Sequence, residues 1–368
     1  MKSRRCTALL LVLLLAGCQQ DAHRRSESAE PLRAAVQERW RWEATPPAYV
    51  GMPAADPTGV AFTSALSRLI LLDVAGRTLW TAGKAHLRDV APRLTPDLVT
   101  ATTEHGLAAF DRADGTARWV AELGERPNTP ALGGDTFVAS TWEGSLFGVD
   151  KASGTVRWRS PIPGPALGPA ATDGRIAVVT WVADDNIVAG VVAVDVDTGE
   201  RRWAVALPPG GVSGPAITLT EDGPAEVVAV AGDLAAHGLD LETGRELWRT
   251  PTEGAGSPEV PPLALPGGDV LVAHRLGGLA LLDPAGRLRW EVASDGASVR
   301  GGPAGPSPQG RFAFPLDDGR LLLAGPEAPA SIIDPPGRIS GVASGAGGLL
   351  LVGTRESAGN GLTASTGW

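Results

Sequence analysis

Residues 193–203, AVDVDTGERRW, decide the fold, because variants of this segment recur along the chain. The segment reads A-x-D-x-x-T-G-x-x-x-W. Copies of the same length occupy residues 109–119, 148–158 and 238–248, and copies one residue shorter occupy 71–80 and 281–290. With Trp42, which lacks the Asp-Gly half, they make seven tryptophans spaced 38 to 45 positions apart. A period of this length indicates a repeat protein.

Each part of the repeat has a physical role in forming a strand or a turn. Residues 190–195, GVVAVD, are apolar and β-branched, which favours a buried strand. Asp195 can accept a hydrogen bond from the backbone two residues on and so start a turn. Gly199 supplies the positive φ that a short hairpin needs. Trp203, on the returning strand, brings a large flat surface and one N–H donor, so we expect it to seal one repeat against the next.

The same reasoning applies to every copy and predicts a set of structural residues. They are Trp42, Trp80, Trp119, Trp158, Trp203, Trp248 and Trp290, with Asp111, Asp150, Asp195 and Asp240, and with Gly115, Gly154, Gly199 and Gly244.

The rest of the repeat predicts an all-β fold. The chain has 48 Gly and 31 Pro and short apolar runs at even spacing, without helical periodicity. One repeat divides into strands at 129–132, 136–141, 144–150 and 156–159. Four-stranded units of about 40 residues around a channel are typical of a β-propeller.

Counting outer strands predicts eight blades. Seven outer strands contain the tryptophans, and an eighth passes through residues 331–333. Residues 339–366 supply three further strands, and residues 40–43 supply one. We therefore expect an eight-bladed β-propeller of antiparallel blades whose last blade is closed by the N-terminal strand, since closure removes exposed sheet edges. Seven blades with an appended strand is the alternative.

The first residues predict export and lipidation. A basic start is followed by ten apolar residues, 7–16, which is short for a membrane span and typical of a signal peptide. Residues 15–18, LAGC, resemble the lipobox of bacterial lipoproteins, which implies cleavage before Cys18 and acylation of its thiol. The predicted divisions are a signal peptide at 1–17, a lipidated cysteine and tether at 18–37, and one propeller at 38–368. A plain signal peptide with an incidental cysteine is the alternative, and the export route, general or twin-arginine, stays open.

Cysteine content and charge exclude several functions. Cleavage removes Cys6 and lipid occupies Cys18, so no disulfide and no thiol catalyst is expected. The chain has 32 basic and 41 acidic residues, and removal of the signal peptide leaves 29 against 41. An acidic protein of this kind argues against binding to nucleic acid and against electrostatic docking to anionic lipid.

No catalytic, metal-binding or cofactor-binding residue is predicted. The sequence lacks G-x-S-x-G, G-x-G-x-x-G and P-loop motifs. His105, His237 and His274 are expected in exposed hairpins between second and third strands, in three separated blades, where they cannot converge on one metal ion.

Two tryptophans lie outside the repeat and are candidate partner-binding residues. Trp142 and Trp181 end the second strands of blades three and four, next to Pro-rich connections such as residues 160–165. Both hairpins open on one face, and interfaces favour tryptophan. Packing within their own blades is the alternative.

The repeat resembles the tryptophan-docking repeat of PQQ-like β-propellers. Eight such blades behind a lipobox are similar to the BamB-like lipoproteins of the outer-membrane β-barrel assembly machinery. The resemblance implies a non-catalytic scaffold, anchored to the outer membrane and facing the periplasm, with envelope proteins as partners. The alternatives are a PQQ-dependent quinoprotein dehydrogenase and a surface-exposed ligand-binding or sensor propeller. Those dehydrogenases usually carry a vicinal Cys-Cys pair and a Ca²⁺ site, and this sequence has no such pair.

Overall fold

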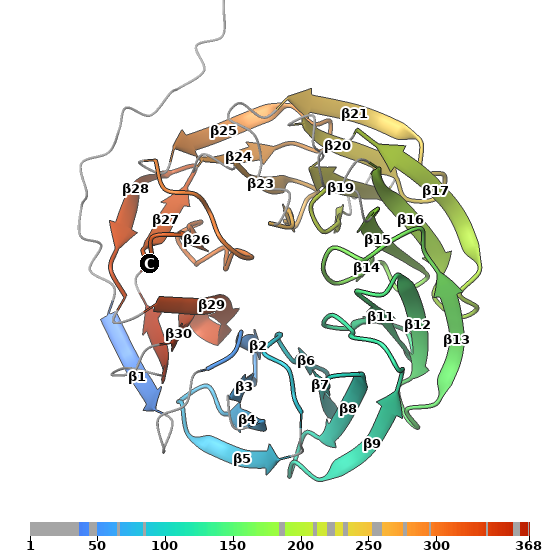
Figure 1. The fold of residues 1–368 in the computed structure, drawn as a ribbon. Coiled ribbons are helices and arrows are strands. Elements are labelled where there is room, and N and C mark those ends of the chain that lie inside the picture. The colour runs from blue at the N-terminus through green and yellow to red at the C-terminus, as the bar shows by residue number, and fades with distance from the viewer. Residues whose placement is uncertain are drawn as a thin grey trace, which may run out of the picture.

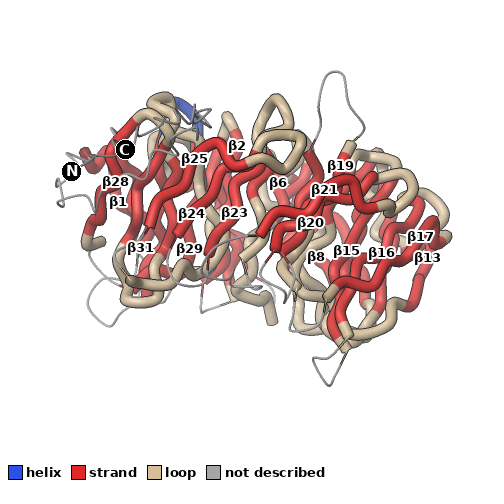
Figure 2. Tube along the Cα trace, turned by 90° about the horizontal axis from the view of Figure 1, so that it is seen from above, coloured by secondary structure: helices blue, strands red, loops and turns tan. Residues whose placement is uncertain are grey.

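The structure is a computed structural model. It describes residues 37–43, 50–64, 67–83, 86–183, 188–208, 212–218, 225–230, 235–251, 260–274, 278–293, 296–335, 338–355, 361–366 and 368. In these ranges the chain forms small antiparallel sheets arranged in a ring around a central channel, which is a β-propeller (Figure 1). Figure 2 shows the ring from the side, with the strands of neighbouring blades standing next to one another.

Blades 1 to 4 each contain four strands that follow in sequence from the channel outward. They are β2 (Ala54–Asp56), β3 (Gly59–Ser64), β4 (Arg68–Leu72) and β5 (Thr78–Gly83) in blade 1; β6 (Arg93–Leu94), β7 (Leu98–Thr102), β8 (Gly106–Asp111) and β9 (Ala117–Glu122) in blade 2; β10 (Ala131–Gly133), β11 (Thr136–Ser140), β12 (Ser145–Asp150) and β13 (Val156–Pro161) in blade 3; and β14 (Ala171–Thr172), β15 (Ile176–Val182), β16 (Ala189–Asp195) and β17 (Arg201–Leu207) in blade 4.

Blades 5 to 8 complete the ring. They are β18 (Ala216–Thr218), β19 (Glu226–Val230), β20 (Ala235–Asp240) and β21 (Glu246–Pro251) in blade 5; β22 (Leu263–Ala264), β23 (Val270–His274), β24 (Gly278–Leu282) and β25 (Leu288–Ala293) in blade 6; β26 (Phe312–Pro315), β27 (Leu321–Gly325) and β28 (Ala328–Ile333) in blade 7; and β29 (Arg338–Gly345), β30 (Leu349–Arg355), β31 (Gly361–Thr366) and β1 (Gln37–Glu43) in blade 8. A 3₁₀ turn, η1 (Ala346–Gly348), joins β29 to β30.

Blade 8 is closed by the first strand of the chain, as the sequence predicts. β1 pairs antiparallel with β31 and forms the outer edge of the sheet. Figure 1 shows β1, in blue, beside the red strands of the end of the chain. Because the ring is closed by two distant segments, its integrity depends on contacts between the ends of the sequence.

Blade 7 differs from the expected four strands. Its sheet has three, and the inner position is marked only by isolated bridges between Val299 and Leu316 and between Ala304 and Ala313. The inner strands of blades 3 and 4 start at Ala131 and Ala171, the equivalents of Ala304, and in blade 7 the residues that follow are Gly305 and Pro306. The prediction of four strands is wrong here because proline cannot donate to a ladder and glycine weakens strands.

The repeat tryptophans cover the glycine turns of the following blade. Trp80 of blade 1 donates a 2.8 Å hydrogen bond from Nε1 to the carbonyl of Arg112 in blade 2. Its ring lies against Gly115, where an added Cβ would be 2.7 Å from Trp80 Cδ2 and where φ is +75°. Glycine is therefore required at position 115 for two reasons: the backbone has a positive φ, and a Cβ would have no room. The same packing joins Trp119 to Gly154, Trp158 to Gly199, Trp203 to Gly244, and Trp248 to Gly286.

Trp40, and not Trp42, holds the docking position of blade 8. Trp40 Nε1 donates to the carbonyl of Val74, 3.1 Å away, and the ring covers Gly76 of blade 1. The irregular register beside Trp40 matches the one beside Trp80. The prediction that Trp42 holds this position is wrong. Residues two apart on a strand face the same side, so both tryptophans reach blade 1. Trp42 instead packs edge-on to Phe62, with ring centroids 4.9 Å apart.

Trp368 fills the interface between blades 7 and 8. In the described part of the chain, no glycine turn of either blade is covered by a repeat tryptophan. Trp368 is 1% exposed and packs with Leu321 and Leu323 of blade 7 and with Leu350 of blade 8. Its Nε1 donates to the carbonyl of Gly348 at 2.7 Å. One indole therefore joins two blades that lack the repeated docking contact.

Hydrogen bonds and ion pairs hold the aspartate turns of the repeat. Asp150 Oδ1 accepts from the backbone N–H of Ser153 at 2.7 Å, and Asp150 also pairs with Arg157 of the outer strand. Hydrogen bonds from the Ser153 backbone and hydroxyl and from Arg157 lower the pKa of Asp150 to about 2. Asp195 and Arg202 form the equivalent pair at 2.8 Å in blade 4.

Blade 5 provides a test of pH-dependent stability. Glu226 is 6% exposed and its Oε2 accepts the Trp248 Nε1 hydrogen bond at 2.9 Å. Burial raises the pKa of Glu226, the Trp248 bond partly opposes that rise, and the carboxylates of Asp240 and Asp283 add to it. A carboxyl with a raised folded pKa binds more protons in the folded state, so its contribution to stability is lost as pH rises above its unfolded pKa.

Glu226→Gln keeps the acceptor for Trp248 and removes this titration. We expect the variant to be more stable than wild type at pH 7, with the difference shrinking as pH falls toward the usual glutamate pKa of about 4.3. Urea unfolding of both proteins across this range measures the effect. A difference that stays constant with pH would show that Glu226 does not titrate in the folded protein.

Candidate functional site

One face of the ring carries the hairpins between second and third strands together with the connections between blades. We call it the hairpin face. The two kinds of loop are bonded to each other: the Trp142 N–H donates to the carbonyl of Arg126, and the Ala166 N–H donates to the carbonyl of Thr141. Hairpins and connections therefore support one another, which makes this face suited to presenting fixed side chains.

Trp142 lies on the hairpin face and is 51% exposed. Its Nε1 donates to Asn128 Oδ1 at 3.1 Å, and the Arg126 guanidinium lies 5.9 Å from the centre of its ring. Arg126 is itself held by Glu143, with a distance of 2.7 Å between Nε and Oε1. The indole is thus fixed at its polar edge and open to solvent over its apolar surface, as an interface anchor should be.

Glu125, which is mostly buried, stiffens the hairpin that carries Trp142. Its side chain is 11% exposed. It accepts hydrogen bonds from Thr141 Oγ1 at 2.6 Å, from Ser145 Oγ at 3.1 Å and from Arg159 Nη2. A hairpin held at both ends by one carboxylate has little conformational freedom to lose when a partner binds.

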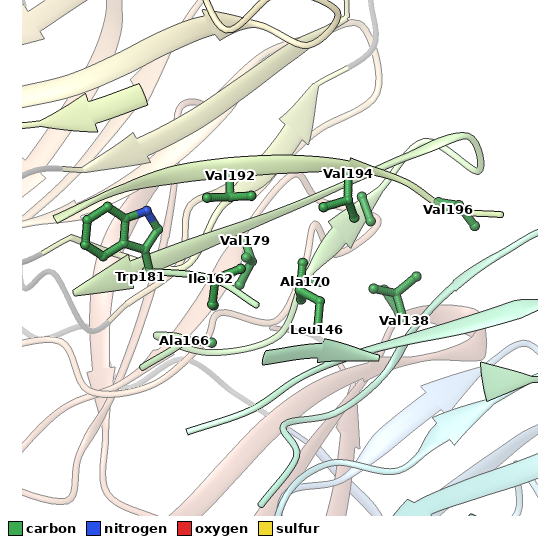
Figure 3. Close-up of a cluster of buried hydrophobic side chains, with 12 residues drawn as sticks. Val138, Leu146, Ile162, Ala166, Ala170, Val179, Trp181, Val192, Val194 and Val196 are labelled. Carbon is green, nitrogen blue, oxygen red and sulfur yellow. The ribbon is translucent and has the colours of Figure 1, made fainter. Parts of the chain in front are cut away.

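Trp181 does not reach the surface, so the expectation that it is exposed is wrong. It is 7% exposed and belongs to a buried cluster with Ile162, Ala166 and Val179 (Figure 3). The connection between blades 3 and 4 covers it, since Ala166 forms a β-bridge with Trp181 itself. Sequence spacing suggested that Trp181 is the equivalent of Trp142, but the matching bridges Pro127–Thr141 and Ala166–Trp181 make it the equivalent of buried Thr141, where a partner cannot reach it.

The histidines are not gathered into one site. His105 lies between β7 and β8, as expected. His237 lies inside β20, is 1% exposed, and its Nδ1 lies 2.8 Å from Glu246 Oε2, so the expectation of an exposed loop histidine is wrong there. His274 ends β23. In the part of the chain that the structure describes, no three His, Cys, Asp or Glu side chains are grouped to hold a metal ion.

The grouping of acidic side chains is relevant to the quinone cofactor that related propellers bind. The Ca²⁺ that accompanies the quinone in such enzymes needs several oxygen ligands at one place. Among the described residues, no three His, Cys, Asp or Glu side chains are grouped in this way. We therefore derive no reaction through it.

A cavity of about 620 Å³ opens at the channel end of the hairpin face, between blades 7, 8 and 1. Its walls include Met52, the loop 300–303, the hairpin residues Leu316 and Asp317, and residues 338–342 of β29. A second cavity of about 520 Å³ adjoins it over the hairpin of blade 7 and shares Asp317, Gly319 and Arg338. Sequence reasoning missed this site, because its walls come from three blades and no single stretch of sequence marks it.

The sequence matches the family model of the outer membrane protein assembly factor BamB. The matched segments are residues 33–168, 103–257, 166–301 and 232–320, which together cover most of the chain. This chain belongs to the BamB family. A comparison with curated protein sequences finds no match.

Solved structures show the same fold as this BamB-family chain. BamB from Moraxella catarrhalis is 17% identical, with a TM-score of 0.68, and the match covers 90% of this chain and 98% of that one. The C-terminal WD40 domain of Sif2 is 12% identical, with a TM-score of 0.72 and coverage of 90% and 98%. A europium-containing methanol dehydrogenase is 14% identical, with a TM-score of 0.65 and coverage of 87% and 84%. Because a BamB protein, a WD40 domain and a methanol dehydrogenase share the ring, the structural likeness shows the fold alone.

The predicted lipid anchor lies outside the described residues. Cys18 and the divisions at 1–17 and 18–37 fall in the undescribed start of the chain, apart from Gln37. No helix among the described residues is long and apolar enough to cross a membrane.

Proposed function

We propose that this protein is a non-catalytic scaffold of the cell envelope, a BamB-like accessory factor in the assembly of outer-membrane β-barrel proteins. The observation that carries the proposal is the match to the BamB family over residues 33–320. The rigid hairpin face with its exposed Trp142 supports it, since scaffolds present preformed surfaces. A quinoprotein dehydrogenase is the rival class, and among the described residues no three His, Cys, Asp or Glu side chains are grouped.

The partner surface in this proposal is the hairpin face around Trp142. The indole is the exposed large aromatic side chain of this face, and Arg126 and Glu143 surround it with a polar rim. A central aromatic with charged residues at the edge is the usual composition of a binding hot spot. The partner is then an envelope protein, with the β-barrel assembly machinery as the first candidate.

Trp142→Ala is expected to weaken capture of this partner by about 2–4 kcal/mol, the range for a hot-spot tryptophan. The tagged protein is isolated from solubilised envelopes, and co-purified components of the β-barrel assembly machinery are quantified for wild type and variant. Leu79→Ala is the matched control, because Leu79 is 54% exposed on an outer strand. Absence of the machinery from the wild-type isolate would overturn the proposed function, whereas equal capture by Trp142→Ala would overturn only the anchor.

Anchoring through Cys18 belongs to the same proposal. Cys18→Ser is expected to move the protein from the membrane fraction to the soluble periplasmic fraction, since the acyl chains of a lipidated cysteine supply the several signals that stable attachment needs. Fractionation followed by immunoblotting measures the distribution. If the variant stays with the membrane after a salt wash, lipidation at Cys18 is not what holds it there.

A further inference from the structure

β29 is unusual among the inner strands of the ring. It has eight residues, Arg338–Gly345, whereas the inner strands β2, β6, β10, β14, β18 and β22 have two or three. It pairs on one side with β30 and is the last strand of its sheet on the channel side. Among the described residues, its other edge forms no backbone hydrogen bond. A long free edge is a template for a further strand.

The cavity of about 620 Å³ runs along this free edge. Five consecutive residues of β29, 338–342, line it. Successive side chains of a strand point to opposite faces, so a cavity lined by five in a row lies beside the edge and not over one face. Residues 300–303, which form the connection leading into blade 7, also line the cavity.

The cavity carries more positive than negative charge. Arg300 and Arg338 line it, both are exposed, and neither guanidinium forms an ion pair or hydrogen bond with a described residue. The third charged residue of the lining is Asp317, whose Oδ1 accepts from the Ser298 N–H at 3.2 Å. The adjoining cavity is also lined by Asp318, which pairs with Arg320, and by Asp334. Two such arginines in a chain of net charge −9 point to an anionic ligand.

We propose that this cavity binds an extended acidic peptide segment of a partner protein, which adds as a strand to the free edge of β29 and directs a carboxylate to Arg300 and Arg338. Backbone hydrogen bonds to β29 supply pairing, and the arginines select the charge, as strand addition combines the two elsewhere. The volume is within the usual range for a ligand site, about 300–1,000 Å³. This site is separate from Trp142 and goes beyond the proposed scaffold role.

The test uses a set of fluorescent heptapeptides of alternating Val and Thr with one Asp, placed at each position in turn, and the same set with Lys. Binding to the full-length protein is followed by fluorescence anisotropy. We expect members of the Asp set to bind and the Lys set not to bind. The double variant Arg300→Ala, Arg338→Ala should weaken binding about tenfold to a hundredfold, the equivalent of losing a charge-assisted hydrogen bond.

Two controls test whether binding depends on these two arginines and on strand pairing. Arg68→Ala removes an exposed arginine from the start of β4, outside the cavity, and should leave binding unchanged. N-methylation of alternate peptide nitrogens tests strand pairing: one register should abolish binding and the other should preserve it. Hydrogen exchange in β29 should slow when the peptide is bound.

Binding that survives the double arginine variant, or that is indifferent to N-methylation in both registers, overturns the proposal. A complete failure of the Asp peptides to bind also overturns the proposal. Partner capture through Trp142 is measured separately on the same arginine variant and should be unchanged, so failure of the peptide site and failure of the scaffold role are distinguishable.

Discussion

A chain lacking residues 37–43 is expected to unfold at a much lower temperature than the full chain. β1 is the outer strand of blade 8, and its tryptophans Trp40 and Trp42 pack against Phe62 and other buried residues of blade 1. Loss of a buried tryptophan costs about 3–5 kcal/mol, and both here are only partly buried. Even so, the two losses together with an unpaired β31 edge approach the total stability of a typical domain, about 5–15 kcal/mol.

Thermal unfolding monitored by circular dichroism measures this effect. The deletion also predicts rescue, because a synthetic peptide of residues 37–43 can pair with the exposed edge of β31 and should raise the melting temperature again. Within the full chain, Trp40→Ala should destabilise strongly, whereas Arg41→Ala removes an exposed side chain and serves as the control. If the deleted chain melts with the wild type, β1 does not close the ring.

Trp368→Ala is expected to destabilise the protein by about 3–5 kcal/mol, the range for truncation of a buried tryptophan. Trp368 is 1% exposed, its Nε1 donates to the Gly348 carbonyl, and its ring joins blades 7 and 8, which lack the repeated tryptophan-on-glycine contact. Removal leaves a cavity at a place where blade 7 already lacks an inner strand.

Urea unfolding measures the free energy, and hydrogen exchange locates the damage. Faster exchange is expected first in β26, β27 and β30. Trp142→Ala is the matched control, because that indole is 51% exposed and its loss should cost far less. Equal free energies of unfolding for the two alanine variants would show that Trp368 does not hold the two blades together.

Local chemistry explains why the repeat predicted the architecture. Asp195 and Gly199 specify a turn through hydrogen bonding and a positive φ of +70° at Gly199, and both effects act within a few residues of the chain. Trp203 can then pack against the glycine turn one repeat later, so the period of the repeat alone indicates how neighbouring blades meet. The same logic placed the outer strand of blade 7 at residues 331–333 and the closing strand β1 of blade 8 at the start of the chain.

The strand register of β1, and not the spacing of the tryptophans, determines which indole docks on blade 1. Trp40 and Trp42 are two positions apart and face the same side of β1, so composition cannot choose between them. The irregular pairing between Glu38 and Trp40 sets which indole meets Gly76. Blade 7 shows a related limit: the repeat predicts a four-stranded unit, and Gly305 and Pro306 interrupt it at the position of the inner strand.

The sequence by itself determined the ring, its closure by the first strand and the family, because these follow from short-range turn chemistry repeated at a fixed period. The functional surface was decided by tertiary structure. Trp142 and Trp181 are 39 residues apart, yet the matching bridges Pro127–Thr141 and Ala166–Trp181 make Trp181 the equivalent of Thr141 and not of Trp142. Successive strand residues face opposite sides, and Trp181 is 7% exposed whereas Trp142 is 51% exposed. Likewise Met52, Arg300 and β29 line one cavity although they belong to three different blades. Whether a side chain is exposed depends on which other segments of the chain cover it, and the local sequence does not specify this.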